Sequence, residues 1–254
     1  MSRLLSAIPL LRPRAPASPA ATRHPFDLRH GVDTSGLIYA PDLPTGRAGD
    51  SHSEGYYATA PSLFRGAVET WLSTLAAGPA HEDHTFADYA FLDLGCGKGR
   101  VLMLASELPF RSVGGVELNP ALARIARRNL RRFKRSGSQV CRDVSVECAD
   151  ALGLNLQHGL PQGPVLLFLF NSFGAEVLAP LMERLAASAR GRSAPIDLIY
   201  IHPDHEQLVA ATPGIELLRS AEIPFTPEDA QADVFGVSSD FVAVWRLASR
   251  PFPQ

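Results

Sequence analysis

Lysine, cysteine and long apolar runs are all scarce in this sequence of 254 residues. Only Lys98 and Lys134 are lysines among the 24 basic residues, and the arginines are spread along the whole chain. We therefore interpret the skew as a compositional bias and not as a binding surface. The formal net charge is −2, which excludes a strong overall attraction to nucleic acid or to an anionic membrane. No DNA and no membrane partner is expected.

The three cysteines are Cys96, Cys141 and Cys148. Their odd number disfavours a disulfide framework and their spacing is not that of metal ligands, so we expect no metal site and a reducing, cytoplasmic location. The longest apolar runs, such as Val165–Phe170, fall far short of the roughly 20 residues that a membrane helix needs. With 46% hydrophobic and 20% charged residues, the chain has the composition of a folded protein.

Composition divides the chain into three parts. Residues 1–30 are expected to be a flexible tail, because the first 26 residues include five prolines and lack any acidic residue. A secretory or transit peptide is the alternative, although Pro9 interrupts its short apolar run. Residues 31–85 are expected to be an N-terminal extension, irregular at first and then helical over Pro61–Ala77. Residues 86–254 are expected to form the main domain.

Short apolar runs alternate with helical segments through the main domain. Strands are predicted at Ala90–Leu94, Ser112–Glu117, Val144–Cys148, Val165–Phe170 and Ile196–Ile201, and helices at 100–108, Pro120–Arg135 and Ala175–Arg190. This rhythm predicts an α/β fold in which helices cover both faces of a mostly parallel sheet. Two further strands, at 215–218 and 241–247, are separated by a polar loop without a convincing crossover helix, so they should pair antiparallel at one edge.

A glycine-rich turn follows the first of these strands, in Asp93-Leu94-Gly95-Cys96-Gly97-Lys98-Gly99. Glycine lets a backbone press closely against a ligand. The spacing G-x-G-x-G is neither the G-x-G-x-x-G of dinucleotide sites nor that of a P-loop. Asp93 would repel a pyrophosphate, whereas it would attract a ligand with an ammonium or sulfonium group.

The pattern Asp93-x-Gly95-x-Gly97-x-Gly99 resembles the first motif of class I S-adenosylmethionine-dependent methyltransferases. Glu117 ends the second strand, 24 residues after Asp93, where that family binds the ribose hydroxyls, and Asp150 with Ala151 follows the third strand, where it reads the adenine. An isolated acid would be only a turn residue, but three acids in register favour a binding site. The resemblance implies S-adenosylmethionine as cofactor, bound in residues 86–254 by Asp93, Gly95, Cys96, Gly97, Gly99, Glu117, Asp150 and Ala151. It also implies a Rossmann-like, doubly wound sheet of about seven strands with an antiparallel C-terminal edge strand.

Within the class, Tyr57 and Pro61 ahead of a helix are similar to the bacterial group that resembles non-SET lysine methyltransferases. That group places an aromatic, hydroxyl-bearing loop over the cofactor, which implies such a role for Tyr57 and for Thr59 and Ser62. The segment Tyr-Ala-Thr-Ala-Pro matches this loop loosely.

The exit of the fourth strand, Phe170-Asn171-Ser172-Phe173-Gly174, resembles the Asn-Pro-Pro-Tyr/Phe motif that holds an amino nitrogen. The resemblance implies that Asn171 orients the nucleophile and that Phe173 walls the pocket. Because serine replaces the first proline, a turn or cap role for Asn171 is the alternative. The expected reaction is an in-line transfer of a methyl group to nitrogen or oxygen.

Two further features leave alternatives open. His202 and His205 follow the fifth strand, where a histidine suits proton transfer but is more often part of a solvated turn. The helix Pro120–Arg135 is rich in arginine, which would suit an RNA methyltransferase, but a solvated outer face explains it more simply. A small molecule or a protein is therefore favoured over RNA as acceptor. A protein that binds the cofactor without catalysis is the remaining alternative.

Overall fold

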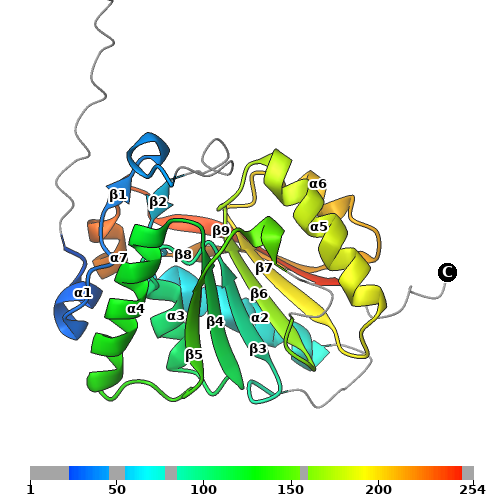
Figure 1. Ribbon diagram of the computed structural model, residues 1–254, viewed down its shortest axis with the longest axis horizontal. Helices are drawn as coiled ribbons and strands as arrows, with labels where there is room; N and C mark the ends of the chain where they lie inside the picture. Colours follow the sequence, from blue (N-terminus) through cyan, green and yellow to red (C-terminus); the bar gives the residue numbers. More distant parts are fainter. Residues whose placement is uncertain (1–22, 46–54, 78–84, 155–159, 248–254) are drawn as a thin grey trace, which may run out of the picture.

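The computed structural model describes residues 23–45, 55–77, 85–154 and 160–247, which fold around one seven-stranded sheet (Figure 1). The strand order is β5-β4-β3-β6-β7-β9-β8. The strands are β3 (Ala90–Leu94), β4 (Ser112–Glu117), β5 (Val144–Cys148), β6 (Val165–Phe170), β7 (Ile196–Ile201), β8 (Ile215–Pro224) and β9 (Ser239–Leu247). The five strands from β3 to β7 have the predicted boundaries, because each is a short apolar run between turn residues.

The direction of the strands confirms the predicted α/β, Rossmann-like, mostly parallel sheet with antiparallel pairing at its C-terminal edge. Strands β5, β4, β3, β6 and β7 pair in parallel, whereas β9 pairs antiparallel with both β7 and β8. The C-terminal strand thus lies between β7 and β8, and β8 is outermost. Both C-terminal strands are longer than expected.

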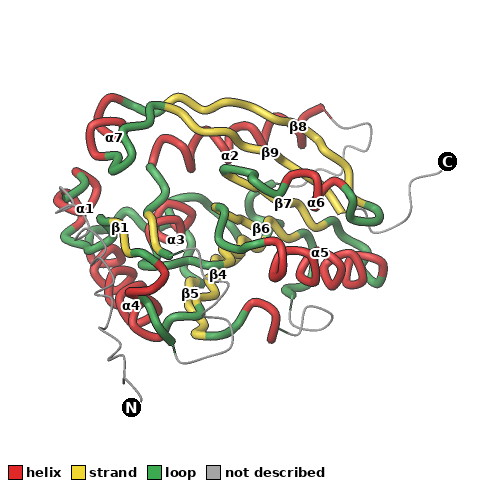
Figure 2. Tube along the Cα trace, turned by 90° about the horizontal axis from the view of Figure 1, so that it is seen from above, coloured by secondary structure: helices red, strands yellow, loops and turns green. Residues whose placement is uncertain are grey.

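Helices cover both faces of the sheet, as Figures 1 and 2 show. One face carries α2 (Pro61–Ala77), α3 (Arg100–Ser106) and α4 (Pro120–Arg135), and the other carries α5 (Ala175–Arg190) and α6 (Glu206–Ala210). Each face has its own apolar core, with Phe91 and Phe168 toward the first set of helices and Leu167 and Leu198 toward the second. Because β-strand side chains alternate between faces, one buried strand supplies both cores.

Further segments, which we call the cap, lie at and beside the carboxyl ends of the parallel strands. Of these, β1 (Leu37–Ile38), η1 (Ala40–Asp42) and β2 (Tyr56–Tyr57) lie at the carboxyl ends. Helix α1 (Pro25–His30) packs against the last turns of α4, and α7 (Pro227–Ala232), from the β8–β9 connection, contacts the start of α2. Segments distant in sequence meet here (Figure 1), since His24 Nε2 lies 3.0 Å from Asp229 Oδ1 and Arg29 pairs with Glu228.

Helix α1 was not expected, since it falls in the segment predicted to be a flexible tail. Its Phe26 and Asp27 are almost fully buried, and the His24 Nδ1 atom accepts a hydrogen bond from the Phe26 N–H at its start. Residues 25–30 are therefore packed structure, whereas residues 1–22 lie outside the described residues. Across the described ranges, no helix is both long and apolar enough to cross a membrane.

Candidate functional site

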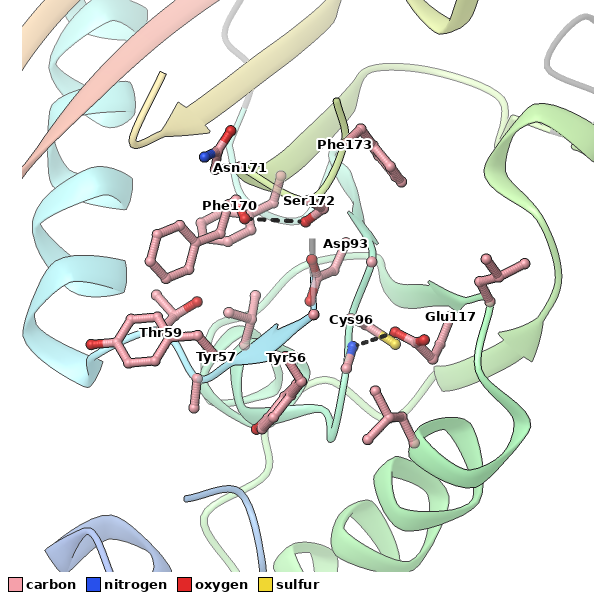
Figure 3. A pocket seen from close by; sticks show the side chains of 18 of the residues that line it. Tyr56, Tyr57, Thr59, Asp93, Cys96, Glu117, Phe170, Asn171, Ser172 and Phe173 are labelled. Atoms are coloured by element: carbon pink, nitrogen blue, oxygen red, sulfur yellow. Dashed lines mark hydrogen bonds between the residues drawn. The ribbon is translucent and has the colours of Figure 1, made fainter. Parts of the chain in front are cut away.

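A cavity of about 800 Å³ opens at the carboxyl ends of the parallel strands, between the sheet and the cap (Figure 3). Polar side chains line it in the order of the strands. They are Asp150 after β5, Glu117 on β4, Asp93 on β3, Asn171 after β6, His202 after β7 and Asp240 near the start of β9. Because β9 is antiparallel, its first residues reach the same edge as the last residues of its neighbours.

The glycine turn forms the floor of the cavity. Gly95, Gly97 and Gly99 all have positive φ angles, of 88°, 52° and 83°, which side chains with a Cβ rarely adopt. A Cβ on Gly97 would lie 2.5 Å from Cε2 of Tyr56. Gly95 and Gly97 line the cavity, while Gly99 lies at the start of α3 and is not part of the lining.

Glu117 is buried beside this turn and its orientation is fixed by two backbone groups. Its Oε2 accepts from the Gly97 N–H at 2.8 Å (Figure 3). Its Oε1 accepts from the Asn119 N–H, also at 2.8 Å. Burial raises the pKa of the Glu117 carboxyl, although these two hydrogen bonds oppose the rise. Each oxygen keeps a lone pair, so the carboxylate can still accept from two hydroxyl groups of a ligand.

Asp93 is the second buried carboxyl group, with 4% of its surface exposed. Its burial, and then the charge of Glu117, raise the pKa of Asp93 well above its ordinary value. Within the described part of the chain, no salt bridge joins either carboxyl group to a basic side chain. Two acids without a counter-charge make this end of the cavity favourable for a cation.

Asp150 and Ala151 lie on the rim at the β5 end. Asp150 lines the cavity, and its Oδ1 also accepts from the Leu152 N–H, which caps the short helix η3 (Ala151–Gly153). Cys96 lines the floor, where burial, Asp93 and Glu117 raise its thiol pKa well above the ordinary value. A thiol in that environment stays protonated and acts as an apolar contact rather than a nucleophile.

Aromatic side chains line the end of the cavity that lies away from Asp150. The Tyr57 ring packs edge-on against Phe170 at 5.7 Å and against Phe235 at 5.2 Å between centroids. The Tyr57 hydroxyl donates to Asp233, and burial together with this carboxylate raises the tyrosine pKa. Of the other loop residues expected there, Thr59 lines the cavity, whereas Ser62 binds Asp229 and Thr226 outside it.

Asn171, Ser172 and Phe173 all line the cavity but point in different directions. The Asn171 amide points away from Asp93 (Figure 3). Its Nδ2 donates to Asp204 Oδ2 at 2.8 Å. Ser172 lies over the glycine turn, since a Cβ on Gly95 would lie 2.8 Å from its side chain. Asn171 therefore belongs to a polar network, and of these three residues it is Ser172 that contacts the glycine turn.

A chain of polar contacts runs along the rim from Asn171 to Asp240. His202 Nδ1 lies 2.9 Å from Asp240 Oδ1, and His202 Nε2 lies 3.6 Å from Asp204 Oδ1. Asn171 and His202 are the only non-glycine residues with positive φ in the described ranges, at 37° and 50°. Such backbone conformations cost free energy and cluster at functional sites. His205 is not part of the cavity lining.

Buried polar contacts hold the N-terminal segment against the glycine turn. Arg100, with 5% of its surface exposed, donates to Thr34 Oγ1 and to the Thr59 carbonyl oxygen. The Tyr56 hydroxyl donates to the Thr34 carbonyl oxygen, and the Lys98 ammonium lies 5.0 Å from the centre of the Tyr56 ring. The cap and the floor of the cavity are therefore one connected unit.

Helix α4 uses several of its arginines for contacts within the protein. Arg127 donates to the Val146 carbonyl oxygen, Arg128 pairs with Asp33, and Arg132 donates to the Gly31 carbonyl oxygen. These contacts attach the helix to β5 and to the N-terminal segment. The basic helix therefore has a structural role within the protein. RNA binding, the alternative raised from the sequence, is a separate role.

Sequence reasoning missed Tyr56, Phe235 and Asp240. Tyr56 had a signal, since two aromatic residues follow Gly55 directly. Phe235 and Asp240 had none, because they reach the cavity only through the position of β9 in the sheet.

No known protein family matches this sequence, and no curated protein matches it. The chain is similar in structure to magnesium protoporphyrin IX methyltransferase from Synechocystis PCC 6803 with bound SAM, at 12% identity over 72% of this chain and 78% of that chain, with a TM-score of 0.45. It is also similar to the plantazolicin methyltransferase BpumL in complex with SAH, with 16% sequence identity over 75% of this chain and 85% of that chain and a TM-score of 0.47. A third similar structure is the 23S rRNA methyltransferase ErmE, with 14% sequence identity over 79% of this chain and 72% of that chain and a TM-score of 0.46. Similarity at this level assigns no activity, so the function has to be argued from the site itself.

Proposed function

We propose that the protein is an S-adenosylmethionine-dependent methyltransferase that transfers a methyl group to nitrogen or oxygen. The observation that carries this proposal is the position of Asp93, Glu117 and Asp150. The three carboxylates lie at or just beyond the carboxyl ends of three neighbouring strands, around a glycine turn at one end of a single cavity.

The charges at this end suit S-adenosylmethionine better than a dinucleotide. Its ammonium and sulfonium groups are cations that would offset the buried charges of Asp93 and Glu117. A pyrophosphate would add negative charge beside two acids. The residues present therefore fit this cofactor.

Each residue of the cavity then has a role in binding. Glu117, already fixed by two backbone N–H groups, would accept from the two ribose hydroxyls. Asp150 and Ala151 would contact the adenine, and Asp93 the ammonium group. Cys96, Gly95 and Gly97 would form the floor, while Tyr57 would cover the ligand from the cap. Gly99 would act indirectly, by starting α3.

When bound, the cofactor supplies a methyl group already activated by its positively charged sulfur. The protein's task is then to align the nucleophile and to exclude water. Phe170 lines the end where the acceptor would lie, and Phe173 is assigned to wall the pocket. Asn171 is the nearby amide that we assign to orienting the acceptor, through its contact with Asp204.

Calorimetry tests the proposal. The purified protein should bind S-adenosylmethionine and S-adenosylhomocysteine, and Glu117→Gln should weaken both by about 100-fold, because an amide accepts fewer hydrogen bonds than a carboxylate. Glu147→Gln on the neighbouring strand β5 is the control, since Glu147 does not line the cavity. Binding of a nicotinamide dinucleotide without binding of either adenosyl compound would refute the proposal.

A further inference from the structure

We propose that the acceptor is a small aromatic molecule with an acidic hydroxyl group, and that His202 takes the proton of that hydroxyl. The inference rests on the proposed function and specifies its acceptor. Three features of the end of the cavity away from Asp150 carry it: an uncovered aromatic wall, an acidic rim, and an oriented imidazole.

The aromatic wall consists of Tyr57, Phe170 and Phe235. Phe235 is 60% exposed and the nearby Val237 is 42% exposed, although both are large apolar residues and both line the cavity. Exposed apolar side chains that face into a cavity favour a flat apolar ligand that would cover them. The wall is composed of side chains from the cap, from β6 and from the β8–β9 connection.

The charges at this end disfavour an acceptor that is already anionic before it binds. Asp240 lines this end of the cavity, and Asp204, outside the lining, lies 3.6 Å from His202. Arg100 is the only lysine or arginine among the described residues that line the cavity. Its guanidinium group already binds Thr34 and Thr59. A carboxylate or phosphate ligand would therefore meet like charge without a free cation, which also disfavours nucleic acid.

The orientation of His202 makes its Nε2 atom a proton acceptor. Asp240 Oδ1 lies 2.9 Å from Nδ1 and also accepts from the Phe241 N–H, so a proton must lie on Nδ1. The lone pair of neutral His202 is then on Nε2, 3.6 Å from Asp204 Oδ1. Once Nε2 takes a proton, the imidazolium lies between Asp240 of β9 and Asp204, which Asn171 after β6 holds in place.

A hydroxyl group fits this arrangement better than an amine. A neutral amine needs no base before it attacks, and two carboxylates would stabilise its protonated, unreactive form. A phenol must lose its proton to become a good nucleophile, and an imidazole next to an aspartate is suited to receive it.

Methyl transfer to the hydroxyl oxygen releases one proton. The hydroxyl proton passes to His202 Nε2, and the oxygen uses its electron pair to form a bond to the methyl carbon. The bond between that carbon and sulfur breaks, and sulfur keeps its electron pair. The products are a methyl ether, neutral S-adenosylhomocysteine and a protonated His202, which releases its proton to solvent.

Matched probes on protein saturated with S-adenosylhomocysteine test the proposal: 4-nitrophenol, 4-nitroaniline and 4-nitrobenzoate. We expect 4-nitrophenol to bind about tenfold more tightly than either of the others. Phe235→Ala should weaken it about tenfold through loss of an aromatic contact. Phe241→Ala is the control, since Phe241 is similarly exposed at 58% but does not line the cavity.

The absorbance of bound 4-nitrophenol reports its ionisation directly. In the wild type the phenolate should form at a lower pH than in His202→Gln, because His202 Nε2 holds the released proton. His205→Gln is the control: His205 does not line the cavity, so this variant should behave like the wild type. Equal or tighter binding of 4-nitrobenzoate or 4-nitroaniline, no binding of any probe, no loss in Phe235→Ala, or an unchanged pH profile in His202→Gln would each overturn the inference. Failure of S-adenosylhomocysteine to bind, measured first by calorimetry, would instead refute the proposed function.

Discussion

Replacing Asp93 with asparagine should stabilise the ligand-free protein and weaken its affinity for the cationic cofactor. The wild-type side chain is 4% exposed, and its pKa is raised well above the ordinary value by burial and by Glu117. The folded protein therefore binds more protons at this group than the unfolded chain does, so its stability falls as the pH rises through the raised pKa. Asparagine removes that penalty at high pH.

The expected size follows from the burial. One pKa unit corresponds to about 1.4 kcal/mol, and removing a buried charge without a counter-charge should add about 2 kcal/mol to the free energy of unfolding at pH 8. For a chain of this length, that is a rise in Tm of about 4–8 °C. At pH 4, where the carboxyl is protonated in the folded protein, the gain should vanish. Affinity for S-adenosylmethionine should fall by about 3 kcal/mol, or roughly 150-fold.

Thermal unfolding at pH 4 and pH 8 and calorimetric titration measure the two effects. Asp150→Asn is the control for stability, because the Asp150 side chain is exposed and should change Tm little. A lower or unchanged Tm for Asp93→Asn at pH 8, or an unchanged affinity, would show that the two buried acids do not create the preference for a cation.

Three further variants test other parts of the structure. Gly97→Ala should lower the free energy of unfolding by about 2 kcal/mol and abolish measurable calorimetric binding of S-adenosylhomocysteine. The reason is that alanine is strained at a φ of 52° and its Cβ would collide with Tyr56. Binding as tight as that of the wild type would contradict this. Burial alone would raise the pKa of Asp229, but hydrogen bonds from His24 and Ser62 lower it to about 2. Asp229→Asn should therefore lose about 2 kcal/mol in urea unfolding at pH 7, an effect that fades as the pH falls from about 4 toward 2, and equal stability at pH 7 would refute it. Arg124 and Arg131 are exposed on α4, and replacing both with alanine should leave RNA binding and its salt dependence unchanged in a filter assay; a shallower salt slope would instead support an RNA acceptor.

The sheet was predictable because its signals are local. Each of the strands β3 to β7 is an apolar run that ends in a turn. Asp93 and Glu117 lie near the ends of β3 and β4, and Asp150 follows β5. The glycine spacing similarly fixed the start of α3, although the helix ends at Ser106 rather than at residue 108. The cofactor end of the cavity could thus be assembled from the sequence.

The acceptor end depends on long-range contacts that leave no local pattern. Strand β8 is half-buried or exposed along its whole length and has no long apolar run, so only its first part was predicted. Helix α1 lies in a proline-rich, acid-poor segment and is held by partners more than 60 residues away, among them Arg100. The contact between His202 and Asp240 spans 38 residues and exists only because β9 inserts beside β7.

The position of β9 makes the last described stretch of the chain decisive for assembly. Among the described strands β8 pairs with β9 alone, so a chain that stops before Ser239 would lose two strands rather than one. During synthesis on the ribosome, β3 to β7 emerge first and can pair with one another, while β8 must wait for a neighbour that follows it. The rim aspartate at position 240 arrives with that neighbour, so a nascent chain would complete the cofactor end well before the end that selects the acceptor.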